Sequence, residues 1–181
     1  MRVAKKEILD RKVIDTLLAA APVGRLGTIG RDGYPMVKPL NFVYREKRIY
    51  FHSALSGEKI ESILQDGRVC FEVDRPLLYV KSRGIPCNAD YLYQSVIIRG
   101  RACVVAAGQE KITALRALME KYQPEGGYGD FPDDRLAVTA VVRIDILEMK
   151  GKQDLGKEGE QEAVQRIIHH QFRPVAVLER F

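Results

Sequence analysis

The sequence predicts a mainly β fold of the α+β class, an antiparallel barrel of about six strands with flanking helices. Three observations predict it. Hydrophobic residues alternate with a period of two in several segments between residues 23 and 149. Short turn sequences join the first of these segments, and helical spacing is confined to a few stretches around them. A doubly wound α/β fold would require helices between successive strands, and no helical spacing interrupts residues 23–52.

The first predicted element is a helix over residues 5–20. Leu9, Val13 and Leu17 follow one i, i+4 line, and Pro22 then ends the helical pattern. From residue 23 the period changes to two, and the Asp-Gly of the first turn is typical of a tight hairpin. The antiparallel strands expected from this pattern are 23–29, 36–44 and 49–52.

The second half of the chain alternates between the same two patterns. Period-two alternation predicts strands over 68–74, 94–105 and 137–149. Helical spacing predicts helices over 57–66, 108–121 and 160–171, and residues 122–134 form a long loop. Residues 75–90 carry two prolines and a glycine and are expected to be irregular, apart from a short strand at 78–80. Gly100, in the middle of a strand, indicates a bulge or a close approach of neighbouring backbone.

The composition excludes several classes of protein. The 181 residues combine 46% hydrophobic content with 29 Lys and Arg against 24 Asp and Glu, which excludes a disordered chain. The net charge is +5, and the basic residues are spread along the chain, so we expect no nucleic-acid partner. The modest positive electrostatic field would suit a small anionic ligand. No apolar run approaches the roughly 20 residues of a membrane-spanning helix. Acidic residues near the N-terminus argue against a signal peptide, so a cytoplasmic protein without a membrane partner is expected.

The cysteines and histidines show no metal-binding pattern. The three cysteines are widely spaced, without a Cys-x-x-Cys pair, so we expect no metal site. Cys70 and Cys103 lie in apolar runs and are expected to be buried in strands, whereas Cys87 is expected to be a free loop thiol. His169 and His170 are interpreted as solvated tail residues.

The most informative segment is 51–60, Phe-His-Ser-Ala-Leu-Ser-Gly-Glu-Lys-Ile. A strand is expected to end at His52, and a helix to begin near Gly57 with Ser56 as its N-cap. The first turn of a helix has unpaired backbone N–H groups and partial positive charge, and with Lys59 added it favours a phosphate ligand. The alternative is an ordinary serine cap followed by a surface Glu-Lys pair. His52 is either a structural residue or, because it precedes this turn, a ligand contact.

The segment 34–44, Tyr-Pro-Met-Val-Lys-Pro-Leu-Asn-Phe-Val-Tyr, is the second candidate. Pro39 cannot donate a hydrogen bond to a sheet, so backbone groups of 37–41 would remain free for the edge of a ligand. Lys38 and Asn41 would add side-chain donors. Alternatively, this is an edge strand whose proline protects against aggregation.

Five segments in the expected order carry a resemblance to a known family. They are Val23-Gly-Arg-Leu-Gly-Thr, the 34–44 strand, Phe51-His-Ser-Ala-Leu-Ser-Gly-Glu-Lys, Asp90-Tyr-Leu-Tyr-Gln-Ser-Val-Ile-Ile-Arg-Gly-Arg-Ala and Arg143-Ile-Asp-Ile-Leu-Glu-Met-Lys-Gly-Lys. Together they resemble the pyridoxamine 5′-phosphate oxidase-like split-barrel flavoproteins, specifically the nitroimidazole-resistance (Nim-type) branch. The resemblance covers about 10–152. We therefore expect one FMN-binding domain at 1–152, with 153–181 as an extension packed on it or on a dimer partner.

The resemblance implies a six-stranded split β-barrel that forms a homodimer with two FMN sites at the subunit interface. One strand segment would line the isoalloxazine edge, namely Met36, Val37, Lys38, Pro39, Leu40 and Asn41. The ribityl chain would run past His52, Ser53 and Ala54. Gly57 and Lys59 would hold the phosphate. Ser95 and, as weaker candidates, Tyr91 and Tyr93 would reach the flavin in the partner's site.

Two departures from the true oxidases of this family bear on the activity. Glu58 stands where those enzymes have an arginine beside the phosphate lysine, and the chain has no tryptophan, which they use near the C-terminus. Vitamin B6 oxidation is therefore not expected. The resemblance implies instead a Nim-type oxidoreductase that takes electrons from a nicotinamide or another donor and reduces a small electron-poor acceptor, such as a nitroaromatic, with His52 donating a proton or hydrogen bond. Two alternatives remain: a haem-binding protein with His52 as axial ligand, and a flavin-binding module without turnover.

Overall fold

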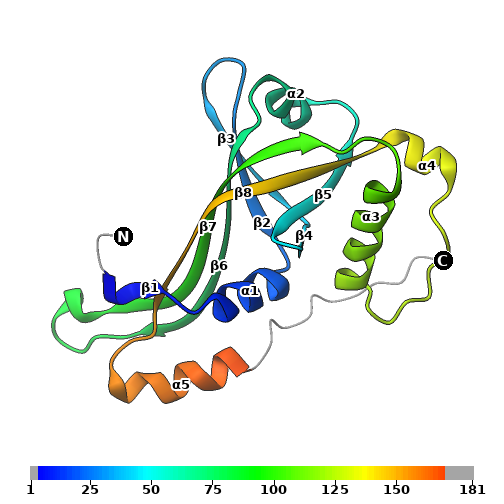
Figure 1. The fold of residues 1–181 in the computed structure, drawn as a ribbon. Helices are drawn as coiled ribbons and strands as arrows, with labels where there is room; N and C mark the ends of the chain where they lie inside the picture. Colours follow the sequence, from blue (N-terminus) through cyan, green and yellow to red (C-terminus); the bar gives the residue numbers. More distant parts are fainter. Residues whose placement is uncertain (1–3, 170–181) are drawn as a thin grey trace.

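The computed structural model describes residues 4–169, which form one curved antiparallel sheet of eight strands with helices around it (Figure 1). The strands are β1 (Glu7–Ile8), β2 (Gly24–Ile29), β3 (Pro35–Leu40), β4 (Val43–Arg45), β5 (Arg48–Ala54), β6 (Arg68–Val80), β7 (Asp90–Val104) and β8 (Thr139–Asp154). The helices are η1 (Ala4–Lys6), α1 (Arg11–Ala20), α2 (Glu58–Gln65), η2 (Pro86–Asn88), α3 (Gln109–Tyr122), α4 (Asp133–Val138) and α5 (Glu158–His169). Neighbouring strands follow the order β3-β2-β6-β7-β8-β5-β4, and β1 pairs with β8.

The two edges of this sheet are held close together by the chain itself. β3 and β4 lie at opposite ends of the strand order, yet only Asn41 and Phe42 separate them in sequence. Three Cα–Cα steps span at most about 11 Å, so the edges must approach each other. The sheet therefore curls into a barrel that stays open between β3 and β4, which confirms the predicted split barrel. It has eight strands rather than six, because the segment 36–44 is divided into β3 and β4 and β1 adds a short strand.

The interior of the barrel follows from the period-two alternation of its strands. Leu26, Phe71, Ile98 and Ile144, from four different strands, are at most 1% exposed. α1 adds Leu18 to this same core. Because alternate residues of each strand fill the interior, the intervening residues form an outer face that is available for other contacts.

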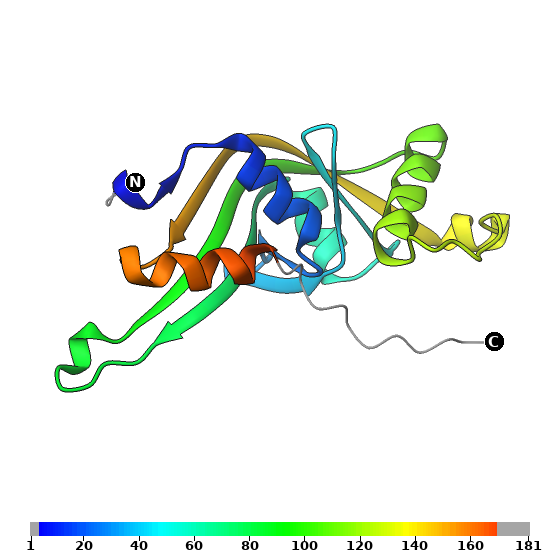
Figure 2. The ribbon, with the colours of Figure 1, turned by 90° about the horizontal axis from the view of Figure 1, so that it is seen from below.

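β6 and β7 extend beyond the barrel as a long two-stranded arm (Figures 1 and 2). The expectation that 75–77 is irregular is wrong, because β6 continues to Val80 and includes the short strand predicted at 78–80. A shift in strand register just after Pro76 accommodates the proline. α5 packs along the arm, where Val164 contacts a small cluster that includes Leu77 and Leu92.

The prediction for Gly100 is confirmed, whereas that for Cys70 is not. The register of β7 and β8 shifts at Gly100, and a Cβ there would lie 2.6 Å from the backbone oxygen of Asp145, which confirms both a bulge and a close approach. The prediction that Cys70 is buried is wrong. Its neighbours Val69 and Phe71 point into the barrel, so Cys70 lies on the exposed outer face. Cys103 is half-buried.

Several element boundaries differ from those predicted. The helix expected over 5–20 begins only at Arg11, where the Asp10 carboxylate accepts a hydrogen bond from the Lys12 backbone N–H at 2.8 Å. α4 was not predicted, and β8 begins after it. The helix expected over 160–171 is α5, and His170 lies outside the described residues. Between residues 4 and 169, no helix combines the length and the apolar character that crossing a membrane would need.

Candidate functional site

The turn between β5 and α2 presents a helix terminus without a side-chain cap. Gly57, rather than the predicted Ser56, is the N-cap residue, and its φ of 110° lies in a region that favours glycine. The serine-cap prediction is therefore wrong, and no side chain of the described residues caps this first turn. Residues 55–58 are exposed. The free N–H groups at the positive end of α2 are thus open to a ligand.

Three basic side chains gather at this terminus: Lys38 from β3, His52 from β5 and Lys59 from α2. The Lys59 Nζ lies 5.2 Å from the centre of the Phe51 ring. Burial lowers the pKa of Lys59, and the charge of Lys38 lowers it further. Partial burial also lowers the pKa of His52, with a further contribution from Lys59, although the imidazole keeps an exposed surface. A bound anion would relieve this mutual repulsion.

Glu58 neutralises one of these cations. Its Oε2 lies 2.5 Å from the Lys38 Nζ, and a carboxylate in the first turn of α2 is also favoured by the helix dipole. Lys59, in contrast, forms no ion pair with any residue between 4 and 169. Lys59 is therefore the cation of this corner that remains available for an external anion.

β3 supplies a free strand edge beside the cluster. It is the first strand of the sheet order, so one side of its backbone has no strand partner among residues 4–169. Pro39 stands on this edge, as the edge-strand interpretation requires. Val37 is 66% exposed, whereas Lys38 is half-buried and turned toward α2 through its contact with Glu58. Asn41 follows the strand and is exposed. The segment predicted to contact a ring edge thus lies next to the basic cluster.

The candidates on β7 lie elsewhere in the chain. Ser95 pairs in the sheet with Asp74 and Lys152, and Tyr91 lies on the arm with its ring 5.8 Å from that of Tyr79. The structure does not bring Ser95 or Tyr91 to the α2 terminus within one chain. Ser95 alternates with buried neighbours and points to the outer face of the sheet, as Val37 does on β3. Among residues 4–169, no group of three or more His, Cys, Asp or Glu side chains is placed to hold a metal ion.

An apolar pocket beside His52 was not predicted from the sequence. It encloses about 310 Å³ and is lined by Asn41, His52, Leu115, Leu118, Met119, Tyr122, Phe131, Arg135, Leu136 and Thr139. β4 and β5 pair Val43 with Tyr50, and continuing this register places Asn41 opposite His52. His52 therefore belongs to both the basic corner and this pocket.

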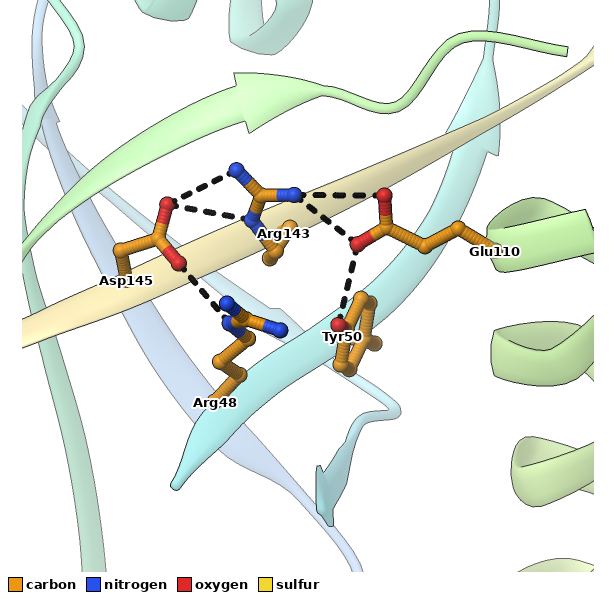
Figure 3. Close-up of polar contacts among 5 residues, drawn as sticks. All are labelled: Arg48, Tyr50, Glu110, Arg143 and Asp145. Atoms are coloured by element: carbon orange, nitrogen blue, oxygen red, sulfur yellow. Dashed lines mark hydrogen bonds and ion pairs between the residues drawn. The ribbon is translucent and has the colours of Figure 1, made fainter. Parts of the chain in front are cut away.

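Helix α3, which forms one wall of the pocket, is held at its first turn by an ionic network (Figure 3). The Arg143 guanidinium donates to both carboxylate oxygens of Glu110, at 2.9 and 3.2 Å, and to Asp145 at 3.1 Å. Tyr50 donates its hydroxyl hydrogen to Glu110 at 3.1 Å, and Arg48 donates to Asp145 at 3.1 Å. Hydrogen bonding to Arg143 lowers the pKa of Glu110. The network fixes the start of α3 on β5 and β8.

The last turn of α3 is held by Tyr122. Its hydroxyl accepts a hydrogen bond from the Phe42 backbone N–H at 3.0 Å and donates to the Pro22 carbonyl at 2.8 Å. Phe42 lies in the two-residue crossing between β3 and β4, so Tyr122 ties α3 to the opening of the barrel. The adjacent Lys121 Nζ lies 3.8 Å from the centre of the Phe42 ring, and burial lowers the pKa of Lys121 to about 8. Neither this contact nor the ionic network was predicted, because their members are far apart in the sequence.

Comparison with known proteins assigns the chain to a family. A family model described as pyridoxamine 5′-phosphate oxidase matches residues 10–153. The chain belongs to this family. A search of curated proteins finds no match.

Solved structures share the same fold. A candidate 5-nitroimidazole antibiotic resistance protein from Bacteroides thetaiotaomicron is 25% identical, covers 81% of this chain and 86% of its own, and has a TM-score of 0.72. The flavocytochrome Anf3 from Azotobacter vinelandii is 21% identical, with coverages of 90% and 77% and a TM-score of 0.77. An FAD and heme binding protein from Mycobacterium smegmatis is 20% identical, with coverages of 87% and 79% and a TM-score of 0.76. These similarities confirm the resemblance stated from the sequence.

Proposed function

We propose that this chain binds FMN with the phosphate at the N-terminus of α2, and that it is a Nim-type oxidoreductase. Lys59 is the observation that carries the proposal. It is a partly desolvated cation without an ion pair among residues 4–169, and it stands beside uncapped backbone N–H groups. A dianionic phosphate at this point would accept hydrogen bonds from the first turn of α2 and counteract the lowered pKa values of Lys59 and His52.

The rest of the cofactor would extend from α2 toward the free edge of β3. His52, Ser53 and Ala54 end the strand that leads into the phosphate turn, so they would line the ribityl chain. On its outer side the backbone of 36–41 pairs with no strand of the described part of the chain, so it would offer N–H and C=O groups to the isoalloxazine edge. The chain's own residues thus suit both ends of FMN.

The site would be completed by a homodimer. The outer face of the β3-β2-β6-β7 wall carries exposed apolar side chains, including Ile29, Val37 and Ile97 at 45%, 66% and 50% exposure. The same face carries the charged group Arg25, Glu72 and Asp74, and exposed apolar side chains beside polar ones are suited to a protein partner. A second copy packed on this wall would bring Ser95 of the partner subunit, which shares the face, toward the flavin. Tyr91 of the partner subunit would contribute from the arm.

Bound FMN would supply hydride and electron transfer, from a nicotinamide or another donor to a small electron-poor acceptor such as a nitroaromatic. The chain would position the ring edge and keep one hydrogen-bond donor beside it. The His52 imidazole carries at least one N–H group in either protonation state, so it can donate this hydrogen bond. The similarity to the nitroimidazole resistance protein supports this choice of acceptor.

An absorption spectrum of the purified protein, with mass analysis of the molecule it releases on denaturation, tests the proposal. We expect flavin bands and the mass of FMN. A colourless protein that does not bind added FMN would contradict the proposal. A yellow protein that oxidises no reductant would support flavin binding without turnover.

A haem-binding function is the second candidate, and His52 is the observation that favours it. Its imidazole makes no hydrogen bond to any residue between 4 and 169 and borders an apolar pocket, and a neutral imidazole is the form that binds haem iron. Expression with added haem tests this function. A Soret band that His52→Ala removes would support it, and the absence of that band would exclude it.

A further inference from the structure

We propose that the apolar pocket beside His52 binds a neutral, single-ring aromatic molecule that carries one hydrogen-bonding substituent. The pocket lies between the end of β5 and helices α3 and α4. Asn41 also belongs to the segment proposed to contact the flavin, so the ligand of this pocket would be the electron acceptor. This assignment rests on the proposed function. The binding itself follows from the pocket alone.

The size and the walls of the pocket define the aromatic part of this ligand. Leu115, Leu118, Met119, Phe131 and Leu136 supply an apolar surface from α3, the following loop and α4. A cavity of about 150 Å³ lined by similar residues holds benzene. The volume here, about 310 Å³, is therefore large enough for one substituted ring.

The polar groups of the pocket define the substituent. The Thr139 hydroxyl already donates to the Arg135 carbonyl at 2.8 Å, and the Tyr122 hydroxyl is engaged at the barrel opening. The side chains of Asn41 and His52 make no hydrogen bond to any residue of the described range, so they are the groups left to bind a ligand. Both are uncharged at neutral pH, and together they can donate to and accept from the same substituent.

An anionic substituent is disfavoured because none of the residues that line the pocket is a buried cation. The Arg135 side chain is 78% exposed and lies 3.6 Å from Asp134. A carboxylate in the pocket would lose its hydration against mainly apolar walls without gaining a desolvated cation. The ligand is therefore neutral.

Contacts within the chain hold the helices that line the pocket. Glu110 and Tyr122 hold the two ends of α3 on the barrel. Lys111 donates from α3 to the Leu136 carbonyl at 2.6 Å, which ties α4 to the same wall. A ligand would therefore not need to order these helices when it binds.

Calorimetric titration of flavin-free protein with benzamide and benzoate tests the proposal. These two molecules have nearly the same shape but differ in charge. We expect saturable binding of benzamide, about tenfold or more tighter than that of benzoate. Met119→Trp should fill the pocket and weaken benzamide binding about tenfold or more, whereas Leu9→Trp, at a residue 87% exposed, should leave it unchanged.

A second variant keeps the test decisive if Met119→Trp does not fold. Phe131→Ala should enlarge the pocket so that 1-naphthamide binds to the variant and not to the wild-type protein. The chain has no native tryptophan, so the fluorescence of the single indole introduced by Met119→Trp reports directly whether that side chain is buried.

Three results would overturn the proposal. They are equal affinity for benzoate and benzamide, unchanged benzamide binding in Met119→Trp together with no 1-naphthamide binding to Phe131→Ala, and competition between FMN and benzamide, which would make this pocket part of the flavin site. If benzamide binds as expected and FMN does not bind at all, the proposed function fails and the pocket assignment stands.

Discussion

The corner at the N-terminus of α2 and the pocket beneath α3 share His52 but differ in every other respect. The corner is basic and exposed, and most of its residues lie within the short segment 52–59. The pocket is apolar, and its residues come from positions between 41 and 139. The end of β5 can therefore contribute to two different binding sites, one for an anion and one for a neutral aromatic ring.

The two-residue crossing between β3 and β4 supports both regions, so its loss should have the largest effect. Phe42 is fully buried, and its ring centre lies 4.9 Å from that of Phe71. Phe42→Ala should lower the free energy of unfolding by about 3–5 kcal/mol and weaken ligand binding in both regions. Urea unfolding measures this loss, with Leu64→Ala, at a residue 71% exposed, as control. A loss no larger than that of the control would contradict the role given to the crossing.

The next largest effect separates the corner from the pocket. Lys59→Ala should weaken FMN binding by about 1.5–3 kcal/mol, because a partly desolvated, charge-assisted contact is lost. Benzamide binding should not change. Titration of both ligands measures this, with Lys12→Ala on exposed α1 surface as the matched control. Unchanged FMN affinity in Lys59→Ala would mean that the phosphate lies elsewhere.

The converse variant should affect the pocket and spare the corner. Glu110→Gln removes the charge that binds Arg143, so it should loosen the start of α3 and cost about 1 kcal/mol of stability. Benzamide binding should weaken a few-fold while FMN binding stays the same. Thermal unfolding and both titrations measure this, with exposed Glu120→Gln on the same helix as control. Equal losses in the two variants would argue against the ionic network as an anchor.

A smaller effect is expected from the carboxylate that competes with the phosphate. Glu58→Gln should tighten FMN binding by about 0.5–1 kcal/mol, because Lys38 is released and a negative charge beside the phosphate is removed. Glu61→Gln is the matched control, since Glu61 stands in the same turn but faces Arg31 at 3.6 Å. A weaker affinity in Glu58→Gln would show that Glu58 orients Lys38 for the ligand instead.

The smallest effect is the pH dependence of FMN binding. The pKa of His52 is lowered, and a bound phosphate favours the charged imidazole, so FMN binding should take up protons. Affinity should therefore rise as the pH falls from 8 toward 6, relative to His52→Gln, in which this rise should be absent. Parallel pH profiles for the two proteins would exclude His52 as a contributor.

The basic corner could be predicted from the sequence because its parts are close together. His52, Gly57 and Lys59 lie within eight residues, and a strand followed by a helix sets their geometry. The identity of the cap could not be predicted, since Ser56 and Gly57 both suit an N-cap and only the positive φ of Gly57 decides between them. The curled sheet could be predicted in outline. Its split at Asn41 and Phe42 could not, because the strand pattern of 36–44 continues across these two residues.

The pocket could not be predicted, because tertiary packing assembles it. Helical spacing assigns Leu115 and Leu118 to a buried face, which is correct, but it does not show what lies opposite. The anchors Glu110 and Tyr122 bind partners that are 33 to 100 residues away. The long loop 122–134 was the one local signal that this part of the chain could contribute to a binding site.

A crystal structure of the protein with FMN tests the central claim most directly. We predict phosphate oxygens about 3 Å from the backbone N–H groups at the start of α2 and from the Lys59 Nζ. A phosphate located away from α2, with Lys59 still facing solvent, would contradict the account.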